Sequence, residues 1–271
     1  MGEKSLTSGG AIVENSVKRA KILSFANQKG GVGKSTSVVN LAASLGLLGK
    51  NVLVVDVDPQ GNTTSGFGIN KKNLKNSVYD VMIGRAAAAG CILKTEFEGI
   101  SVLPANISLA GAEFELVMAD NRENRLKEAL EPFRSKYDYI LIDCPPSLGI
   151  LTINALVASD GIVIPMQCEY YSLEGLSQLI LSVKQIKKRF NPGITLVGIL
   201  VTMYNGRLNL SVQVMEELQK YYPGKIFRTP ITRNVKLSEA PSFGKPVWYY
   251  DKLSKGAVQY MDTAKELLEK F

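Results

Sequence analysis

Histidine is absent from this sequence of 271 residues. The imidazole group is the most frequent general base near neutral pH, so its absence excludes Ser-His and Cys-His nucleophilic sites. Cysteine is scarce as well: Cys91, Cys144 and Cys168 are odd in number, widely spaced and without any Cys-x-x-Cys pair. We therefore expect reduced thiols that fill the core, and neither a disulfide framework nor a cysteine-bound metal.

Long apolar runs are also lacking, since none approaches the ~20 residues that span a bilayer. The start of the chain, residues 1–20, is polar and lacks the apolar stretch and small-residue cleavage site of a secretory signal. The sequence thus predicts a cytoplasmic protein with a flexible leader over residues 1–20 and a single domain over residues 21–271.

Positive charge is unevenly distributed along the chain. The formal net charge is +7, and residues 181–271 hold 15 Lys and Arg against 7 Asp and Glu, whereas residues 1–180 hold 17 against 18. A positive last third favours a polyanionic partner such as nucleic acid. A lysine-rich surface that contacts only water is the alternative that charge alone leaves open.

Short β-branched runs alternate with longer amphipathic stretches. The runs predict buried strands over residues 21–26, 51–57, 100–104, 138–143, 161–166 and 194–201, and the stretches predict helices over residues 34–48, 109–133, 149–158, 172–190 and 208–221. This alternation predicts an α/β fold, a mostly parallel twisted sheet with helices on both faces. Ligands of such sheets bind at the carboxyl ends of strands, where the motifs described next all lie.

The first predicted strand leads into a glycine-rich loop that opens directly into a helix. The loop comprises Asn27, Gln28, Lys29, Gly30, Gly31, Val32, Gly33, Lys34, Ser35 and Thr36. Apart from Gln28 in the place of the first glycine, this is the phosphate-loop pattern of nucleotide-binding proteins. In such loops, backbone N–H groups and the dipole of the following helix bind the phosphate oxygens. Lys34 would reach the β- and γ-phosphates, Ser35 would ligate Mg²⁺, and Thr36 would face the α-phosphate.

Two more predicted strands end in carboxylates. Asp56 and Asp58 close the second strand with the spacing of residues on one face, and Asp143 closes a later strand in front of Pro145 and Pro146. A buried apolar run that leads to carboxylates is costly unless they bind something. Asp143 fits a Walker B aspartate that holds Mg²⁺ through water, and the two prolines fit a switch loop that responds to the γ-phosphate.

The second lysine of the loop, Lys29, completes the pattern Lys-Gly-Gly-x-Gly-Lys-Ser. This pattern resembles the deviant Walker A signature of the ParA/MinD family of P-loop ATPases, and the Asp-x-Asp-Pro-Gln-Gly-Asn element that starts at Asp56 is similar to another signature of that family. The resemblance implies that two chains sandwich two ATP molecules and that each supplies Lys29 to the other's γ-phosphate, although a lysine so close to its own phosphates could also act in cis. It also implies that Asp58 positions the attacking water and that Asp56 supports Mg²⁺ indirectly.

The resemblance covers roughly residues 20–270. Residues 232–242 are similar to an element of the ParA/Soj partition ATPases that borders the base pocket, and they read Thr-Arg-Asn-Val-Lys-Leu-Ser-Glu-Ala-Pro-Ser. Thr232 stands in place of an expected proline. Residues 250–257 are similar to a second element of that family. The implied function is chromosome or plasmid partition at the nucleoid by an ATP-bound homodimer that binds DNA non-specifically and is activated by a ParB-like protein. The expected DNA contacts are Arg207, Arg233, Lys236, Lys252 and Lys255.

Four other functions compete with partition. A MinD-like membrane-cycling ATPase needs a basic amphipathic C-terminal helix, whereas residues 258–271 have a nearly neutral polar face and an apolar stripe, Met261, Leu267 and Leu268, that predicts packing on the core. A reductase like the nitrogenase iron protein needs paired cysteines for its cluster. A ligase such as dethiobiotin synthetase would keep the phosphate loop but not the element of residues 232–242. A protein that only binds ATP leaves Asp58 unexplained.

Overall fold

The computed structural model describes residues 19–271, so the predicted leader lies outside the described residues apart from Arg19 and Ala20. Within residues 19–271, seven strands form one sheet in the order β3-β4-β2-β5-β1-β6-β7. Their bounds are β1 Lys21–Phe25, β2 Val52–Asp56, β3 Leu93–Lys94, β4 Ile100–Leu103, β5 Tyr139–Asp143, β6 Gly161–Gln167 and β7 Thr195–Thr202.

The six predicted strands are confirmed, and all the pairs among them are parallel. Strand β3 was not predicted; it has only two residues, both exposed, and pairs antiparallel with β4 at the edge of the sheet. An exposed edge strand needs no apolar run, so nothing distinguished it from a loop. The α/β class with a mostly parallel sheet is correct.

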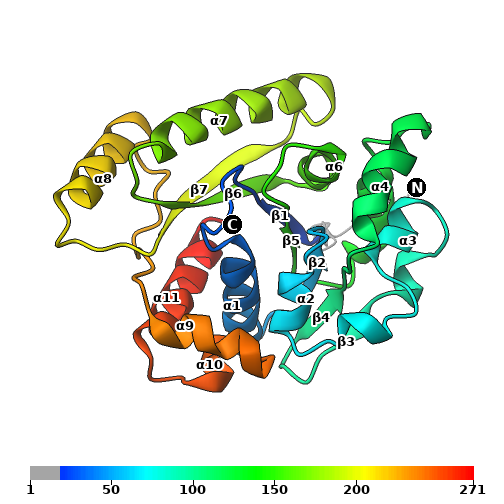
Figure 1. The fold of residues 1–271 in the computed structure, drawn as a ribbon, viewed down its shortest axis with the longest axis horizontal. Coiled ribbons are helices and arrows are strands. Elements are labelled where there is room, and N and C mark those ends of the chain that lie inside the picture. The colour runs from blue at the N-terminus through cyan, green and yellow to red at the C-terminus, as the bar shows by residue number, and fades with distance from the viewer. Residues whose placement is uncertain (1–18) are drawn as a thin grey trace, which may run out of the picture.

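Helices cover both faces of the sheet (Figure 1). One face packs against α1 Lys34–Leu47 and α11 Lys255–Glu269, and the other against α6 Ile150–Ala158 and α7 Ser172–Arg189. The remaining helices are α2 Asn62–Gly66, α3 Val78–Met82, α4 Leu109–Glu115, α5 Arg125–Leu130, α8 Asn209–Tyr221, α9 Val235–Glu239 and α10 Val247–Tyr250, with 3₁₀ turns at Lys71–Asn73, Ala88–Gly90, Leu116–Met118, Glu131–Phe133 and Ala240–Phe243. Each face thus has its own apolar core.

The single helix predicted over residues 109–133 is wrong. Helix α4 ends at Glu115, a 3₁₀ turn follows, and α5 begins only at Arg125. Asn121 adopts a left-handed conformation with φ of 54°, and the side chain of Asn124 donates a hydrogen bond to the side chain of Asn121 at 2.7 Å. Asparagine side chains that bond locally compete with the helical hydrogen bonds, which explains the break.

The C-terminal helix α11 packs its apolar face into the core, as predicted. Met261 and Leu267 are buried, Leu268 is partly buried against the same core, and the hydroxyl of Tyr260 lies 3.1 Å from that of Ser37 on α1. No helix within residues 19–271 is both long and apolar enough to cross a bilayer. The three cysteines are free and buried, as core-filling thiols should be.

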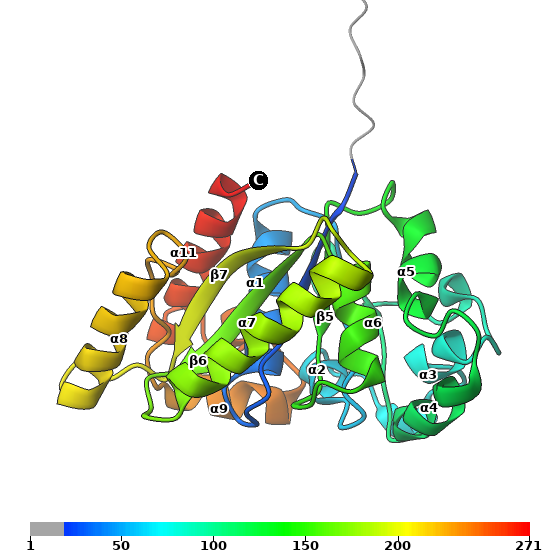
Figure 2. The ribbon, with the colours of Figure 1, turned by 90° about the horizontal axis from the view of Figure 1, so that it is seen from above.

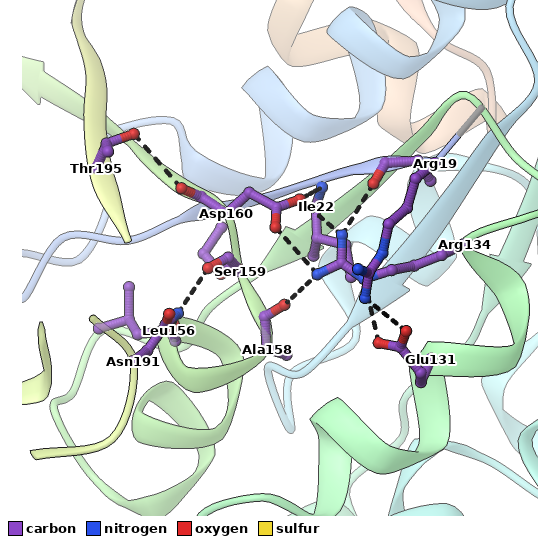
Figure 3. Close-up of polar contacts among 12 residues, drawn as sticks. Arg19, Ile22, Glu131, Arg134, Leu156, Ala158, Ser159, Asp160, Asn191 and Thr195 are labelled. Atoms are coloured by element: carbon purple, nitrogen blue, oxygen red, sulfur yellow. Dashed lines mark hydrogen bonds and ion pairs between the residues drawn. The ribbon is translucent and has the colours of Figure 1, made fainter. Parts of the chain in front are cut away.

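A polar network fixes the amino-terminal edge of the sheet (Figure 3). The Arg134 guanidinium donates to the Ala20 carbonyl at 3.0 Å and to both carboxylate oxygens of Asp160 at 2.8 and 3.0 Å. Asp160 also accepts from the backbone N–H of Ile22 at 2.8 Å, and Glu131 forms ion pairs with Arg134 and Arg19. The network holds the start of β1 beside β6 and so helps to position the loop at the far end of β1.

Candidate nucleotide-binding site

The phosphate loop connects β1 to α1 at the carboxyl edge of the sheet. Gly31 and Gly33 have φ angles of 74° and 83°, in the left-handed region that glycine adopts without strain. The Thr202 hydroxyl, at the end of β7, donates to the Val32 carbonyl at 2.8 Å and holds the loop against the sheet. The loop therefore curls around the N-terminus of the 14-residue helix α1, where free backbone N–H groups attract phosphate.

A cavity of about 720 Å³ opens beside this loop, within the size range of small-molecule sites. Of the residues predicted for the site, the cavity is lined by Gly30, Gly31, Gly33, Lys34, Ser35, Thr36 and Asp58. Lys29, Val32, Asp56 and Asp143 do not line it. Sequence reasoning missed two charged lining residues, Glu113 on α4 and Lys245 between α9 and α10. Neither lies in a local motif, and only the fold brings them to the cavity.

Lys34 is buried at the cavity wall. Its ammonium group donates to the Lys29 carbonyl at 3.2 Å, and burial lowers the pKa of Lys34, an effect that the carboxylate of Asp143 opposes. A buried ammonium is stabilised by any anion that enters the cavity. The position of Lys34 thus fits binding of the β- and γ-phosphates, as expected.

Lys29 occupies a different environment, although it lies only five residues away. Its backbone carbonyl faces Lys34, but its half-exposed ammonium group forms an ion pair with Glu169, in the loop between β6 and α7. The side chain of Lys29 therefore does not enter the cavity of its own chain. This arrangement favours a target outside the chain over action in cis.

Asp56 and Asp143 lie side by side at the ends of neighbouring strands. Both oxygens of Asp56 accept hydrogen bonds, one from the N–H and hydroxyl of Thr64 at 2.8 and 2.7 Å and the other from the N–H of Asp58 at 3.2 Å. Burial raises the pKa of Asp56 to about 6. With no free oxygen, Asp56 ties the end of β2 to α2 and positions Asp58.

Asp143 has the buried oxygen that a hydrated cation would satisfy. Its Oδ2 accepts from the Thr63 hydroxyl at 2.8 Å, whereas its Oδ1 is buried without a hydrogen-bond partner. Burial, reinforced by the charge of Asp56 and opposed by the nearby hydroxyl groups of Ser35 and Thr63, raises the pKa of Asp143 to about 8. Residues 19–271 contain no cluster of three or more acidic or cysteine ligands that could hold a metal alone. Magnesium would therefore need phosphate oxygens, Ser35 and water, which is its usual coordination in nucleotide sites.

Asp58 lines the cavity directly and is nearly buried. Its Oδ1 accepts from the N–H of Gln60 at 2.9 Å, which fixes the carboxylate at the cavity wall. The same cavity is lined by Pro145, Pro146 and Ser147, the predicted switch loop. A water molecule between Asp58 and the phosphates would thus be oriented by a carboxylate.

A smaller cavity of about 280 Å³ lies behind the phosphate loop and shares Gly33, Thr36 and Met203 with the larger one. Thr232 and Arg233 line it, so the element of residues 232–242 borders the nucleotide site. Among the predicted DNA contacts, Arg207, Arg233, Lys252 and Lys255 are exposed. Lys236 is half-buried, donates to Glu239 at 2.9 Å and lies over the ring of Tyr250.

Comparison with known proteins identifies the family. An AAA domain model matches residues 20–196. The chain is 56% identical to the sporulation initiation inhibitor protein Soj of Bacillus subtilis, over 91% of this chain and 98% of that protein. It is 48% identical to the chromosome partitioning protein ParA of Myxococcus xanthus, over 92% of this chain and 88% of that protein. The chain belongs to the Soj/ParA family.

The fold of this Soj/ParA protein also matches nucleotide-bound structures. Cobyrinic acid a,c-diamide synthase from Mycobacterium smegmatis, with an ATP analogue and magnesium bound, superposes with a TM-score of 0.81 at 37% identity, over 92% of this chain and 95% of that chain. The P-loop fold, the ATPase activity and the use of ATP and Mg²⁺ follow from family and fold together. The predicted P-loop ATPase fold and the predicted cofactors are thus confirmed, while the roles of individual site residues stay predictions.

Proposed function

We propose that this protein is a Soj/ParA ATPase that closes into an ATP-bound homodimer, binds DNA non-specifically and drives chromosome or plasmid partition on the nucleoid. The observation that carries the proposal is the separation of the two lysines of the loop. Lys34 lines its own cavity, while Lys29 lies outside it on a half-exposed side chain. Phosphoryl transfer needs positive charge at the γ-phosphate, and a lysine that arrives from a second chain supplies it.

The site residues take the following roles. Gly30 to Gly33, Lys34 and Thr36 bind the phosphates, and Ser35 together with Asp143, through water, holds Mg²⁺. Magnesium held there would supply positive charge to the phosphate oxygens. Asp58 orients the attacking water, and Asp56 keeps the Asp58 segment in place. Loss of the γ-phosphate then relaxes the Pro145–Ser147 segment and opens the dimer.

DNA would be held by the basic residues of the last third of the chain. Arg207, Arg233, Lys252 and Lys255 make no ion pair within residues 19–271, so their charges are available to phosphates. Lys236 already pairs with Glu239 and contributes less. Dimerisation doubles this weak basic surface, which couples ATP binding to DNA binding. A ParB-like activator would stimulate a slow intrinsic ATPase.

A MinD-like membrane role has less support. Such a role needs an amphipathic C-terminal helix that is free to lie on lipid, whereas α11 has Ala257, Tyr260, Ala264 and Leu267 buried in the protein. Releasing this face would expose the apolar core beside α1. Relatives that match nearly the whole chain include the chromosome partitioning proteins ParA of Myxococcus xanthus and of Caulobacter vibrioides.

Retention on non-specific duplex DNA tests the proposal. The Asp58→Ala variant, which should bind ATP without hydrolysing it, is measured with ATP, with ADP and at rising salt. We expect retention with ATP only, lost steeply as salt rises. Lys252→Glu with Lys255→Glu should weaken retention, whereas Lys136→Glu, an exposed residue before β5, should not. Equal retention with ADP and ATP would refute the proposal.

A further inference from the structure

Helix α4 carries an apolar stripe that begins at the nucleotide cavity. Ala110 and Glu113 line the cavity. Phe114 and Val117 continue the same helical face, because residues three, four and seven positions apart lie on one side of a helix. Phe114 is 82% exposed, and Met118, in the turn that ends the helix, is 91% exposed. The stripe of Phe114, Val117 and Met118 therefore contacts no other part of the described chain to any large extent.

The opposite face of the same segment is also apolar. Leu109, Ala112 and Leu116 are fully buried in the core that α5 and α6 share. A surface helix normally has one apolar face and one polar face. A segment that is apolar on two sides needs two partners, and residues 19–271 supply only one of them.

Other exposed apolar side chains share this edge of the sheet. They follow the carboxyl ends of β6 and β7 and comprise Tyr170, Tyr171, Met203, Leu208 and Leu210. Figure 2 shows α2, α4 and α9 along one side of the molecule, opposite the C-terminus. The cavity is lined by residues of α2 and α4 and therefore lies on this side. The edge that holds the nucleotide is thus also rich in uncovered apolar groups.

We propose that the α4 stripe packs against a second copy of this chain when two ATP-bound chains close. The inference rests on the proposed function, because Lys29 reaches another chain's phosphates only if the two cavity-bearing edges face each other. Helix α4 forms part of the cavity wall at that edge, so closure brings its bare stripe into the contact. A two-fold interface uses the same patch on both chains, and a buried aromatic such as Phe114 typically contributes most to such binding.

The arrangement also links nucleotide binding to dimer contact. Glu113 lies against Gly149, at the start of α6: a Cβ on Gly149 would approach the Glu113 carboxylate to 2.7 Å. The switch loop of Pro145 to Ser147 ends two residues before Gly149. A change in that loop when the γ-phosphate binds therefore acts on α4 through Glu113, one residue from Phe114.

The experiment introduces Phe114→Glu and, separately, Met118→Glu into the Asp58→Ala background. The matched control is Leu181→Glu, because Leu181 is 60% exposed on α7, which does not line the cavity. Dimerisation is measured by sedimentation velocity with ATP and Mg²⁺, and single-chain nucleotide binding with a fluorescent ATP analogue. We expect at least tenfold weaker dimerisation for both stripe variants, with nucleotide binding and melting temperature unchanged, and no effect in the control.

The possible outcomes distinguish a failure of the proposed function from a failure of the inference about the α4 stripe. A parent protein that stays monomeric with ATP would overturn both the proposed function and this inference. A parent that dimerises, with stripe variants that dimerise equally well, would overturn the inference alone. Stripe variants that dimerise normally but lose stimulation by an activating protein would also overturn it, and would assign the stripe to that protein.

Discussion

The ammonium group of Lys29 forms an ion pair with the carboxylate of Glu169 and so lies outside the nucleotide cavity of its own chain. The two residues are 140 positions apart, and both side chains are about half exposed. The pair must open before Lys29 can reach a second chain. An ion pair this exposed contributes about 0–1 kcal/mol, so it restrains the lysine only weakly.

Removing the partner of Lys29 should therefore favour the dimer slightly. We expect Glu169→Gln to strengthen ATP-dependent dimerisation at low salt, by up to about fivefold for each of the two lysines, since 1.4 kcal/mol corresponds to a factor of ten. The gain should shrink at high salt, which screens exposed pairs. Sedimentation at several salt concentrations measures it, with Glu174→Gln on α7 as the control. A tenfold loss of dimer in Glu169→Gln would mean that Glu169 acts in the dimer itself.

The stability of the metal-free protein should fall as pH rises from about 4 to about 8. Burial raises the pKa of Asp143 to about 8, above the value of about 4 that an unfolded chain gives it. In that range the unfolded chain is ionised at this position, while the folded chain must keep a proton or bury a charge, so the folded state loses stability. We expect the melting temperature to drop by a few degrees between pH 6 and pH 8.5.

The Asp143→Asn variant is the control for this pH effect. Asparagine cannot ionise, so its melting temperature should change little between pH 6 and pH 8.5, because Asp56, whose pKa burial raises to about 6, lowers stability mainly below pH 6. Addition of ATP and Mg²⁺ should restore stability at pH 8.5 in the parent and not in the variant. An identical pH profile in parent and variant would contradict the role given to the buried oxygen of Asp143.

The Arg134–Asp160 network should matter for folding and not for chemistry. Arg134→Ala leaves the partly buried Asp160 without its cation, a loss that typically costs about 3–5 kcal/mol when such a pair is fully buried. Because one-third of Asp160 is exposed, we expect about 2 kcal/mol in denaturant unfolding. Nucleotide affinity at low denaturant should stay within twofold, since the network lies at the opposite edge of the sheet. A large loss of affinity with little loss of stability would contradict this assignment.

The sequence was informative where a structure depends on consecutive residues. The apolar runs that became β1, β2 and β5 were visible because strands buried on both faces leave no polar positions. The phosphate loop was equally visible, because its turns and its helix N-terminus are made by neighbouring residues from Gly30 to Thr36. The strand ends then placed Asp58 at the cavity through the topology of parallel sheets alone.

Features that depend on distant residues were not predictable from one sequence. Three such features involve segments that are far apart in the chain. They are the ion pair of Lys29 with Glu169, the approach of Glu113 to Gly149, and the position of Lys245 at the cavity. The break in the predicted helix over residues 109–133 arises from local bonds of Asn121 and Asn124, which apolar periodicity does not register. The second apolar face of α4 was hidden for the same reason, because exposure is set by the fold.

The central claim, that Lys29 acts on the nucleotide of a second chain, is tested most directly by mixing two inactive variants. Lys29→Ala keeps its own Asp58, and Asp58→Ala keeps its own Lys29, so a mixed dimer contains one complete site only if Lys29 acts in trans. Random pairing makes about half of the dimers mixed, each with one working site of two, which predicts about a quarter of the parent ATPase rate. No recovery above the sum of the separate variants would contradict the account.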